Sequence, residues 1–232
     1  MRAEILTGFI VIVEISAAIV ITRLPPTICL TALGGMSVIN MLLITIAGAR
    51  LTLLFGFVTN VGNVLYAAVL MSQAMIIERF GGRAALMPVG MIFGSLVMVL
   101  IIGQSIKHMP AVTGNEMVAA AVNAVFALSA RVVWASFVAF GIVNALFVAI
   151  YGALADKPVA LRYAAVAALM QALDSVIFYG ISFWGLVPPG ELATAMLTGF
   201  AIKAAFALLT VPVIALVARD TRHPCVACPL IH

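Results

Sequence analysis

Seven long apolar runs dominate this chain of 232 residues, and charged residues, glycines and prolines mark the connections between them. A helix of about 20 apolar residues crosses the ~30 Å hydrocarbon core of a bilayer. Backbone groups in lipid must be hydrogen-bonded within their own segment, so such runs form helices. We therefore predict an all-α fold, a polytopic transmembrane helical bundle. Its predicted spans lie near residues 5–22, 29–48, 53–77, 85–105, 130–153, 160–185 and 191–217.

The composition leaves almost no room for a soluble domain. Hydrophobic residues make up 65% of the chain and charged residues 9%, whereas soluble domains have roughly 45–50% and ~25%. The Lys and Arg residues are scattered singly between the apolar runs, which argues against nucleic-acid binding. The first run contains Glu14 and is followed by Arg23 without a small-residue cleavage site. It is therefore expected to be a retained helix and not a signal peptide.

The segment 116–129 is apolar but too short to cross a bilayer alone. It is either a re-entrant segment or an extension of the fifth span, and the sequence leaves both interpretations open.

The distribution of basic residues predicts the orientation, because Lys and Arg accumulate in cytoplasmic connections. The opposite side has fewer of them, and the loop 187–190 has none. We therefore expect a multi-pass protein of the cell inner (plasma) membrane with a cytoplasmic C-terminus. The basic residues on the predicted cytoplasmic side are Arg23, Arg79, Arg83, Lys157, Arg162, Arg219 and Arg222.

A faint internal similarity links residues 66–73 (YAAVLMSQ) with residues 163–172 (YAAVAALMQA). The two segments lie in spans that run in opposite directions. That arrangement is typical of the inverted-topology repeats of secondary transporters, here in a 3+3 form.

Polar side chains in the sixth span are the strongest functional signal, because hydrocarbon rejects them unless they have a partner or a cavity. Gln171, Asp174, Ser175 and Phe178 recur at helical spacing and share one face. Such a face offers hydrogen-bonding groups and an aromatic ring to a small planar polar ligand. Lys203 in the last span is the natural counter-ion for Asp174, although such a pair could serve only to hold helices together.

A second polar face lies in the third span, where Asn63, Tyr66 and Gln73 are spaced by three and seven residues. These side chains either contact a ligand or form hydrogen bonds between helices. Both interpretations stay open.

Three segments resemble the queuosine-precursor transporter family, also called the vitamin uptake transporter family. The first is LRYAAVAALMQALDSVIF at 161–178, the second is ASFVAF at 135–140, and the third is ERFGGR at 78–83. The likeness covers roughly residues 36–216.

This resemblance implies a six-helix transporter that imports 7-cyano-7-deazaguanine or 7-aminomethyl-7-deazaguanine into the cytoplasm. Gln171 and Asp174 would then form hydrogen bonds with the guanine-like edge of the base. The first helix lies outside the likeness, so the expected organisation is an additional helix at 1–28, a transporter core at 29–218 and a cytoplasmic tail at 219–232. The expected partners are the deazapurine base and the lipid bilayer, with homo-oligomerisation left open.

The tail combines two cysteines and two histidines within ten residues, His223, Cys225, Cys228 and His232. Two thiolates at this spacing with flanking imidazoles could hold one zinc ion. Reduced cytoplasmic thiols without a structural duty are the commoner outcome, so the chain is expected to need no cofactor.

Two other functional classes compete with transport. An intramembrane enzyme would need Asp174 beside a histidine or a second carboxylate, and His108, the only histidine before the tail, lies in a loop. We therefore predict no enzymatic activity. A non-catalytic scaffold or assembly protein would leave the polar face of the sixth span unexplained. A transporter of another vitamin-like or purine-like solute is the remaining alternative.

Overall fold

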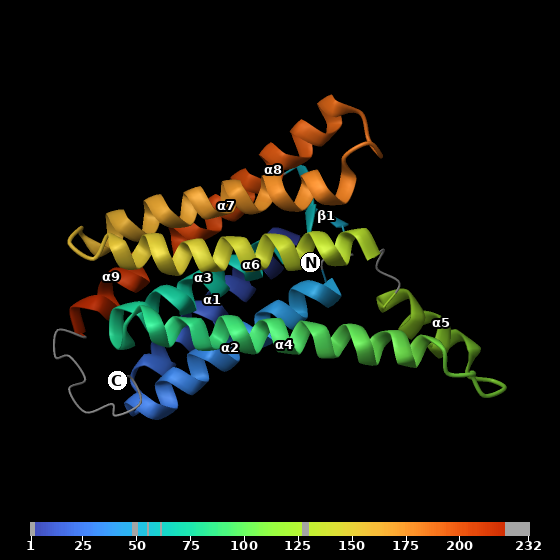
Figure 1. Ribbon diagram of the computed structural model, residues 1–232, viewed down its shortest axis with the longest axis horizontal. Helices are drawn as coiled ribbons and strands as arrows, with labels where there is room; N and C mark the ends of the chain where they lie inside the picture. Colours follow the sequence, from blue (N-terminus) through green and yellow to red (C-terminus); the bar gives the residue numbers. More distant parts are fainter. Residues whose placement is uncertain (1–2, 48–50, 55, 61, 127–129, 221–232) are drawn as a thin grey trace.

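The computed structural model describes residues 3–47, 51–54, 56–60, 62–126 and 130–220. Within these ranges the chain forms a bundle of long helices and one short β-hairpin (Figure 1). The helices are α1 (Ala3–Thr22), α2 (Pro26–Ala47), α3 (Gly62–Phe80), α4 (Gly82–Lys107), α5 (Glu116–Val125), α6 (Ala130–Ala153), α7 (Val159–Phe183), α8 (Pro189–Leu209) and α9 (Val211–Asp220). The strands are β1 (Leu51–Leu54) and β2 (Phe57–Asn60).

Six segments of the described chain are long and apolar enough to cross a membrane. They are α1, α2, α4, α6, α7 and the α8–α9 segment. The predicted multi-pass helical bundle is therefore confirmed. Pro26 and Pro189 each occupy the first position of a helix, where the missing backbone N–H costs nothing.

Helix α3 is the centre of the bundle. Every residue from Gly62 to Ile76 is buried, because α2, α4 and α8 pack against it together with α1, α6 and α9. The helix stops at Gly81, whose φ of 88° is the left-handed conformation that favours glycine. Because α3 is enclosed by other helices and not by lipid, it can carry polar side chains into the interior.

The predicted start of the third span is wrong. Leu51–Leu54 and Phe57–Asn60 pair as antiparallel strands instead of forming a helix, with Leu54 opposite Phe57 and Gly56 at a φ of 82°. The hairpin is rich in β-branched and aromatic residues, which favour strands. An apolar run does not distinguish a buried strand from a helix, so hydropathy extended the span too far. The hairpin contacts α1, α3 and α8.

The segment 116–129 is not a continuous helical extension of α6. Its described part forms the separate helix α5, which projects beside the end of α4 (Figure 1) and has no buried residue. The re-entrant interpretation stays a prediction. Phe126 follows α5, and its ring lies against Gly103 of α4, where a Cβ would be 2.3 Å from the ring.

Helix α1 packs against the core with a few apolar residues, Ala3, Val11, Ile15, Ala18 and Ile21, and is also held by polar contacts. Among its residues only Thr7 and Ala18 are buried. The Asn40 side chain of α2 donates to a carboxylate oxygen of Glu14 at 3.0 Å. The Arg79 guanidinium of α3 donates to the Thr22 carbonyl, at the end of α1. The division of the chain after residue 28 stays a prediction.

The core contains two consecutive sets of three long helices, α2–α4 and α6–α8. Successive spans reverse direction, so α3 and α7 run antiparallel (Figure 1), as the predicted inverted repeat requires. The repeat itself stays a prediction.

Candidate functional site

Asp174 faces the protein interior and not lipid, since only 8% of the residue is exposed. The Lys203 ammonium of α8 donates to its carboxylate, so the ion pair expected from the sequence is present. Both charges lie in a region of low dielectric constant, where a charge without a partner is costly, so each charge stabilises the other.

Asn144 of α6 connects α3 to this pair. Its amide nitrogen donates to the Tyr66 hydroxyl at 3.3 Å, and its amide oxygen accepts from the Gln73 side chain at 2.7 Å. The Tyr66 hydroxyl in turn lies close enough to the Asp174 carboxylate to interact with it electrostatically. The Lys203 nitrogen also lies 5.8 Å from the centre of the Tyr66 ring. A continuous polar chain therefore joins four helices.

Several buried polar atoms beside this chain have no hydrogen-bond partner among the described residues. Both amide atoms of Gln171 are unpartnered, and the residue is 0% exposed. The Ser175 hydroxyl on the same face of α7 and the second amide atom of Gln73, its oxygen, are also unpartnered. A buried polar group without a partner costs about 1–3 kcal/mol. A polar ligand that hydrogen-bonded to these unpartnered atoms would therefore be stabilised here.

We call these residues the polar cluster, and they come from α3, α6, α7 and α8. The polar cluster consists of Tyr66, Gln73, Asn144, Gln171, Asp174, Ser175 and Lys203. Sequence analysis selected every member except Asn144, which stands alone in an apolar span and forms no stripe with other polar residues. The available signal was its position in the middle of the span, where an amide needs a partner.

Two other predicted residues are placed differently. Phe178 lies one turn beyond Asp174 and is half-buried, and its described ring contacts are with Tyr179 and Phe183. Asn63 is buried at the start of α3, about one turn before Tyr66. Neither of these two ring contacts of Phe178 is with a member of the polar cluster.

Close packing of α7 against α8 holds the ion pair in position. A Cβ on Gly199 would lie 2.9 Å from a ring carbon and 3.0 Å from the hydroxyl oxygen of Tyr179. Gly199 is one turn before Lys203, so this contact sets the separation of the helices next to the pair. A side chain at this position would force the Tyr179 ring or the helices to shift.

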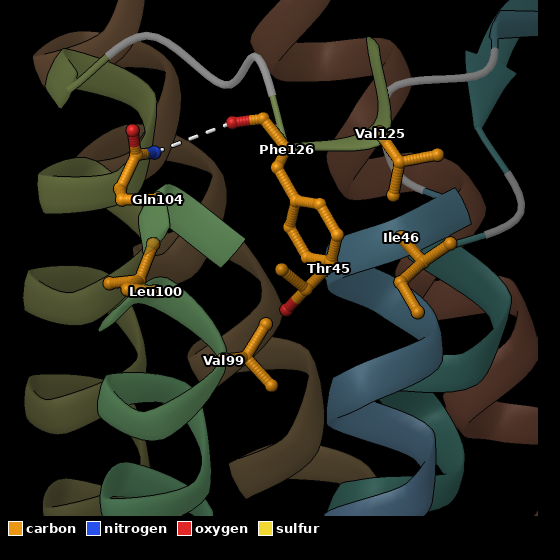
Figure 2. Close-up of a pocket in the computed structure, with 7 residues that line it drawn as sticks. All are labelled: Thr45, Ile46, Val99, Leu100, Gln104, Val125 and Phe126. Carbon is orange, nitrogen blue, oxygen red and sulfur yellow. Dashed lines mark hydrogen bonds between the residues drawn. The ribbon is translucent and has the colours of Figure 1, made fainter. Parts of the chain in front are cut away.

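The polar cluster is closed in this conformation. The side chains of Asp174 and Lys203 are 11% and 6% exposed. The pocket in Figure 2 lies elsewhere, between α2, α4 and the end of α5, and is mostly apolar. Its lining residues are Thr45, Ile46, Val99, Leu100, Gln104, Val125 and Phe126.

The described residues contain no group of three or more His, Cys, Asp or Glu side chains that could hold a metal ion. The four residues proposed for zinc, His223, Cys225, Cys228 and His232, lie outside the described residues.

The sequence matches the family model described as "Putative vitamin uptake transporter" over residues 60–217. That match covers more than half of the chain and includes all seven members of the polar cluster. The chain belongs to the vitamin uptake transporter family. It is therefore a multi-pass membrane transporter for a small molecule and not an enzyme.

A curated relative of this vitamin uptake transporter is the "Probable queuosine precursor transporter" of Bacillus subtilis (strain 168). The two sequences are 25% identical over 164 residues, which is 68% of this chain and 71% of the relative. The family resemblance inferred from the sequence motifs is therefore confirmed. No solved structure matches this vitamin uptake transporter significantly.

Proposed function

We propose that this transporter imports a 7-deazaguanine precursor of queuosine, the cyano or the aminomethyl base, across the cell inner (plasma) membrane. The observation that carries the proposal is Gln171, whose buried amide has an unpartnered donor and an unpartnered acceptor beside the Asp174 carboxylate. The printed name of the Bacillus subtilis relative supports the same substrate class.

The chemistry of the polar cluster matches the edge of a guanine-like base. Such an edge presents a ring N–H and an amino group as donors and a carbonyl oxygen as an acceptor. A carboxylate accepts two donors, and a glutamine amide can donate to the carbonyl and accept from a further donor. The Lys203 ammonium donates to one oxygen of the Asp174 carboxylate. The carboxylate therefore retains acceptor capacity for a guest.

A site that pairs hydrogen-bonding groups with a substrate rejects analogues that lack those groups, because its own buried polar atoms then stay unpaired. Hypoxanthine-like bases without the amino group should be poor substrates for this reason. A scaffold function offers no comparable use for the Gln171 amide.

Because the polar cluster is closed, a base can enter only when α3, α6, α7 and α8 separate on one side of the membrane. Alternating access of this kind is typical of secondary transporters with a midplane site. The proposed orientation places the C-terminus in the cytoplasm. At that end Arg23 and Lys157 lie in helix connections, and Arg83 lies in the first turn of α4.

The proposal is tested by uptake of labelled deazaguanine precursors into cells that cannot make them. Cells with the parent chain should import the label, and membrane-inserted Gln171→Ala and Asp174→Ala variants should not. Gln104→Ala, which changes an exposed glutamine of α4 outside the polar cluster, is the matched control. Import by both site variants at the parent rate would disprove the site assignment. Import of another purine-like solute in preference to both precursors would disprove the substrate.

A further inference from the structure

A second buried ionic group lies at one end of the same four-helix region. Glu78, at the end of α3, pairs with the Arg162 guanidinium near the start of α7. The Tyr151 hydroxyl of α6 donates to the same Glu78 oxygen that Arg162 contacts, at 2.7 Å. The side chains of Arg162 and Glu78 are 4% and 12% exposed. This group forms no part of the polar cluster.

The ionic group also contacts the connection between α6 and α7. Arg162 donates to the Leu154 carbonyl at 3.3 Å, and its guanidinium carbon lies 4.2 Å from the centre of the Tyr151 ring. A planar guanidinium suits both an ion pair and a ring face. The contacts therefore bind three helix ends to one another.

Three aromatic rings lie next to this ionic group. Phe147 and Tyr151 stack at 5.3 Å between ring centres, and Tyr163 meets both rings edge-on at 6.4 Å. All three residues are 0% exposed. The Tyr163 hydroxyl also lies 2.9 Å from the Thr210 hydroxyl, at the junction of α8 and α9. Helices α3, α6 and α7 thus each contribute a side chain to a closure at the same end, and Thr210, directly after α8, adds another.

The closure lies along the line from the polar cluster to that end of the bundle. On α6, Asn144 is followed by Phe147 and then Tyr151. On α7, Asp174 is twelve residues from Arg162, a distance of roughly 18 Å at 1.5 Å per residue. A solute leaving the polar cluster between these helices must pass the rings and then the ion pair.

We propose that Glu78, Tyr151 and Arg162, with the rings of Phe147 and Tyr163, form the cytoplasmic gate of this transporter. This inference rests on the proposed function, which requires a gate, and on the proposed orientation, which places the gate on the cytoplasmic side. The gate is closed in the described conformation. It opens when the Arg162–Glu78 pair separates and α7 moves away from α3.

The test measures the accessibility of a cysteine placed between the gate and the polar cluster. Ala167 is 1% exposed and lies four residues from both Tyr163 and Gln171, on the same face of α7. The reporter is Ala167→Cys in a chain without its three native cysteines, by Cys29→Ser, Cys225→Ser and Cys228→Ser. A membrane-impermeant maleimide is applied to inverted and to right-side-out vesicles.

Glu78→Gln removes the charge that holds Arg162, so it should shift the population toward the open gate. We expect labelling from the cytoplasmic face to become about ten-fold faster, with no change from the outer face. Tyr151→Phe removes only the hydrogen bond to Glu78 and should give a smaller increase. Glu14→Gln, which changes a partly buried glutamate of α1, is the matched control and should leave labelling at the parent rate.

Unchanged labelling in both Glu78→Gln and Tyr151→Phe would disprove the gate. An equal increase in labelling from both faces would also disprove it, because it would indicate a general loosening of the bundle. If Glu78→Gln does not fold, Tyr151→Phe decides alone, because it keeps the ring. An increase confined to the outer face would overturn the cytoplasmic assignment. The labelling needs no substrate, so failed precursor uptake by the parent chain would reject the proposed function without affecting this result.

Discussion

Lys203 of α8 donates to Asp174 of α7 inside a helical bundle, 29 residues apart in the chain. The pair can stabilise the fold, bind substrate, or do both. These roles separate when the two charges are removed singly and together, because a lone buried charge is costly whereas a matched neutral pair is not.

Asp174→Asn and Lys203→Met should each lower the stability of the purified protein by about 3–5 kcal/mol, because each leaves one buried charge without its partner. The double variant should regain most of that stability and still fail to import the deazapurine. Thermal unfolding in detergent and cellular uptake provide the two measurements. A double variant that regains import would show that the pair has only a structural role.

Gln171→Leu should leave stability unchanged or raise it by up to about 1–3 kcal/mol, since it removes two buried polar atoms that have no partner. Uptake should nevertheless fall at least about ten-fold, because the base loses its amide contact. Unfolding midpoints and uptake rates are compared with those of Gln104→Leu, in which neither quantity should change. A strongly destabilised Gln171→Leu protein would mean that the amide has a structural partner.

Asn144→Leu should cost about 1–3 kcal/mol of stability, because the Gln73 amide then has no partner among the described residues. Tyr66 also loses a donor, so the position of its hydroxyl next to Asp174 becomes less defined and uptake should fall. Asn123→Leu, in the separate helix α5, serves as the control. Equal stability of the two variants would show that the amide link between α3 and α6 is energetically unimportant.

Gly199→Ala should destabilise the protein by about 1–3 kcal/mol, since the added Cβ overlaps the Tyr179 ring. Gly141→Ala, in α6, has no atom within 4 Å of the added Cβ and should be tolerated. A double-mutant cycle with Tyr179→Ala measures the coupling. If the cost of Gly199→Ala persists in the Tyr179→Ala background, the clash with the ring is not its cause.

A reporter fused after His232 should be located in the cytoplasm, because the basic connections predict that side for the C-terminus. A C-terminal fluorescent protein should fluoresce, and a C-terminal alkaline phosphatase should be inactive. The reverse result would invert the proposed topology and move the ionic gate to the outer face.

The long helices were predicted well from the sequence, because lipid requires any spanning segment to be a long and apolar helix. The prediction failed at residues 53–54 and 56–60, where Gly56 and β-branched neighbours belong to a hairpin inside an apolar run. Hydropathy measures transfer into an apolar environment, and an apolar hairpin that contacts α1, α3 and α8 satisfies the same measure as a helix.

The candidate site was predicted where polar residues share one helical face, as Gln171, Asp174 and Ser175 do. Asn144 and the Glu78–Arg162 pair escaped prediction for a different reason. Their partners lie on other helices, from 71 to 84 residues away in the sequence, and helical spacing contains no information about such contacts. Arg162 in particular has the sequence context of a loop charge, yet it is almost completely buried.

The enclosed position of α3 has a consequence for how the protein is made. This helix is not among the six described segments that are apolar enough to span a membrane by themselves, and it contains Ser72, Gln73, Glu78 and Arg79. A nascent chain that ended at Phe80 would offer α3 to the lipid with only α1 and α2 beside it. We therefore expect stable insertion of α3 to depend on helices synthesised later, so that biogenesis of this transporter is cooperative and not sequential.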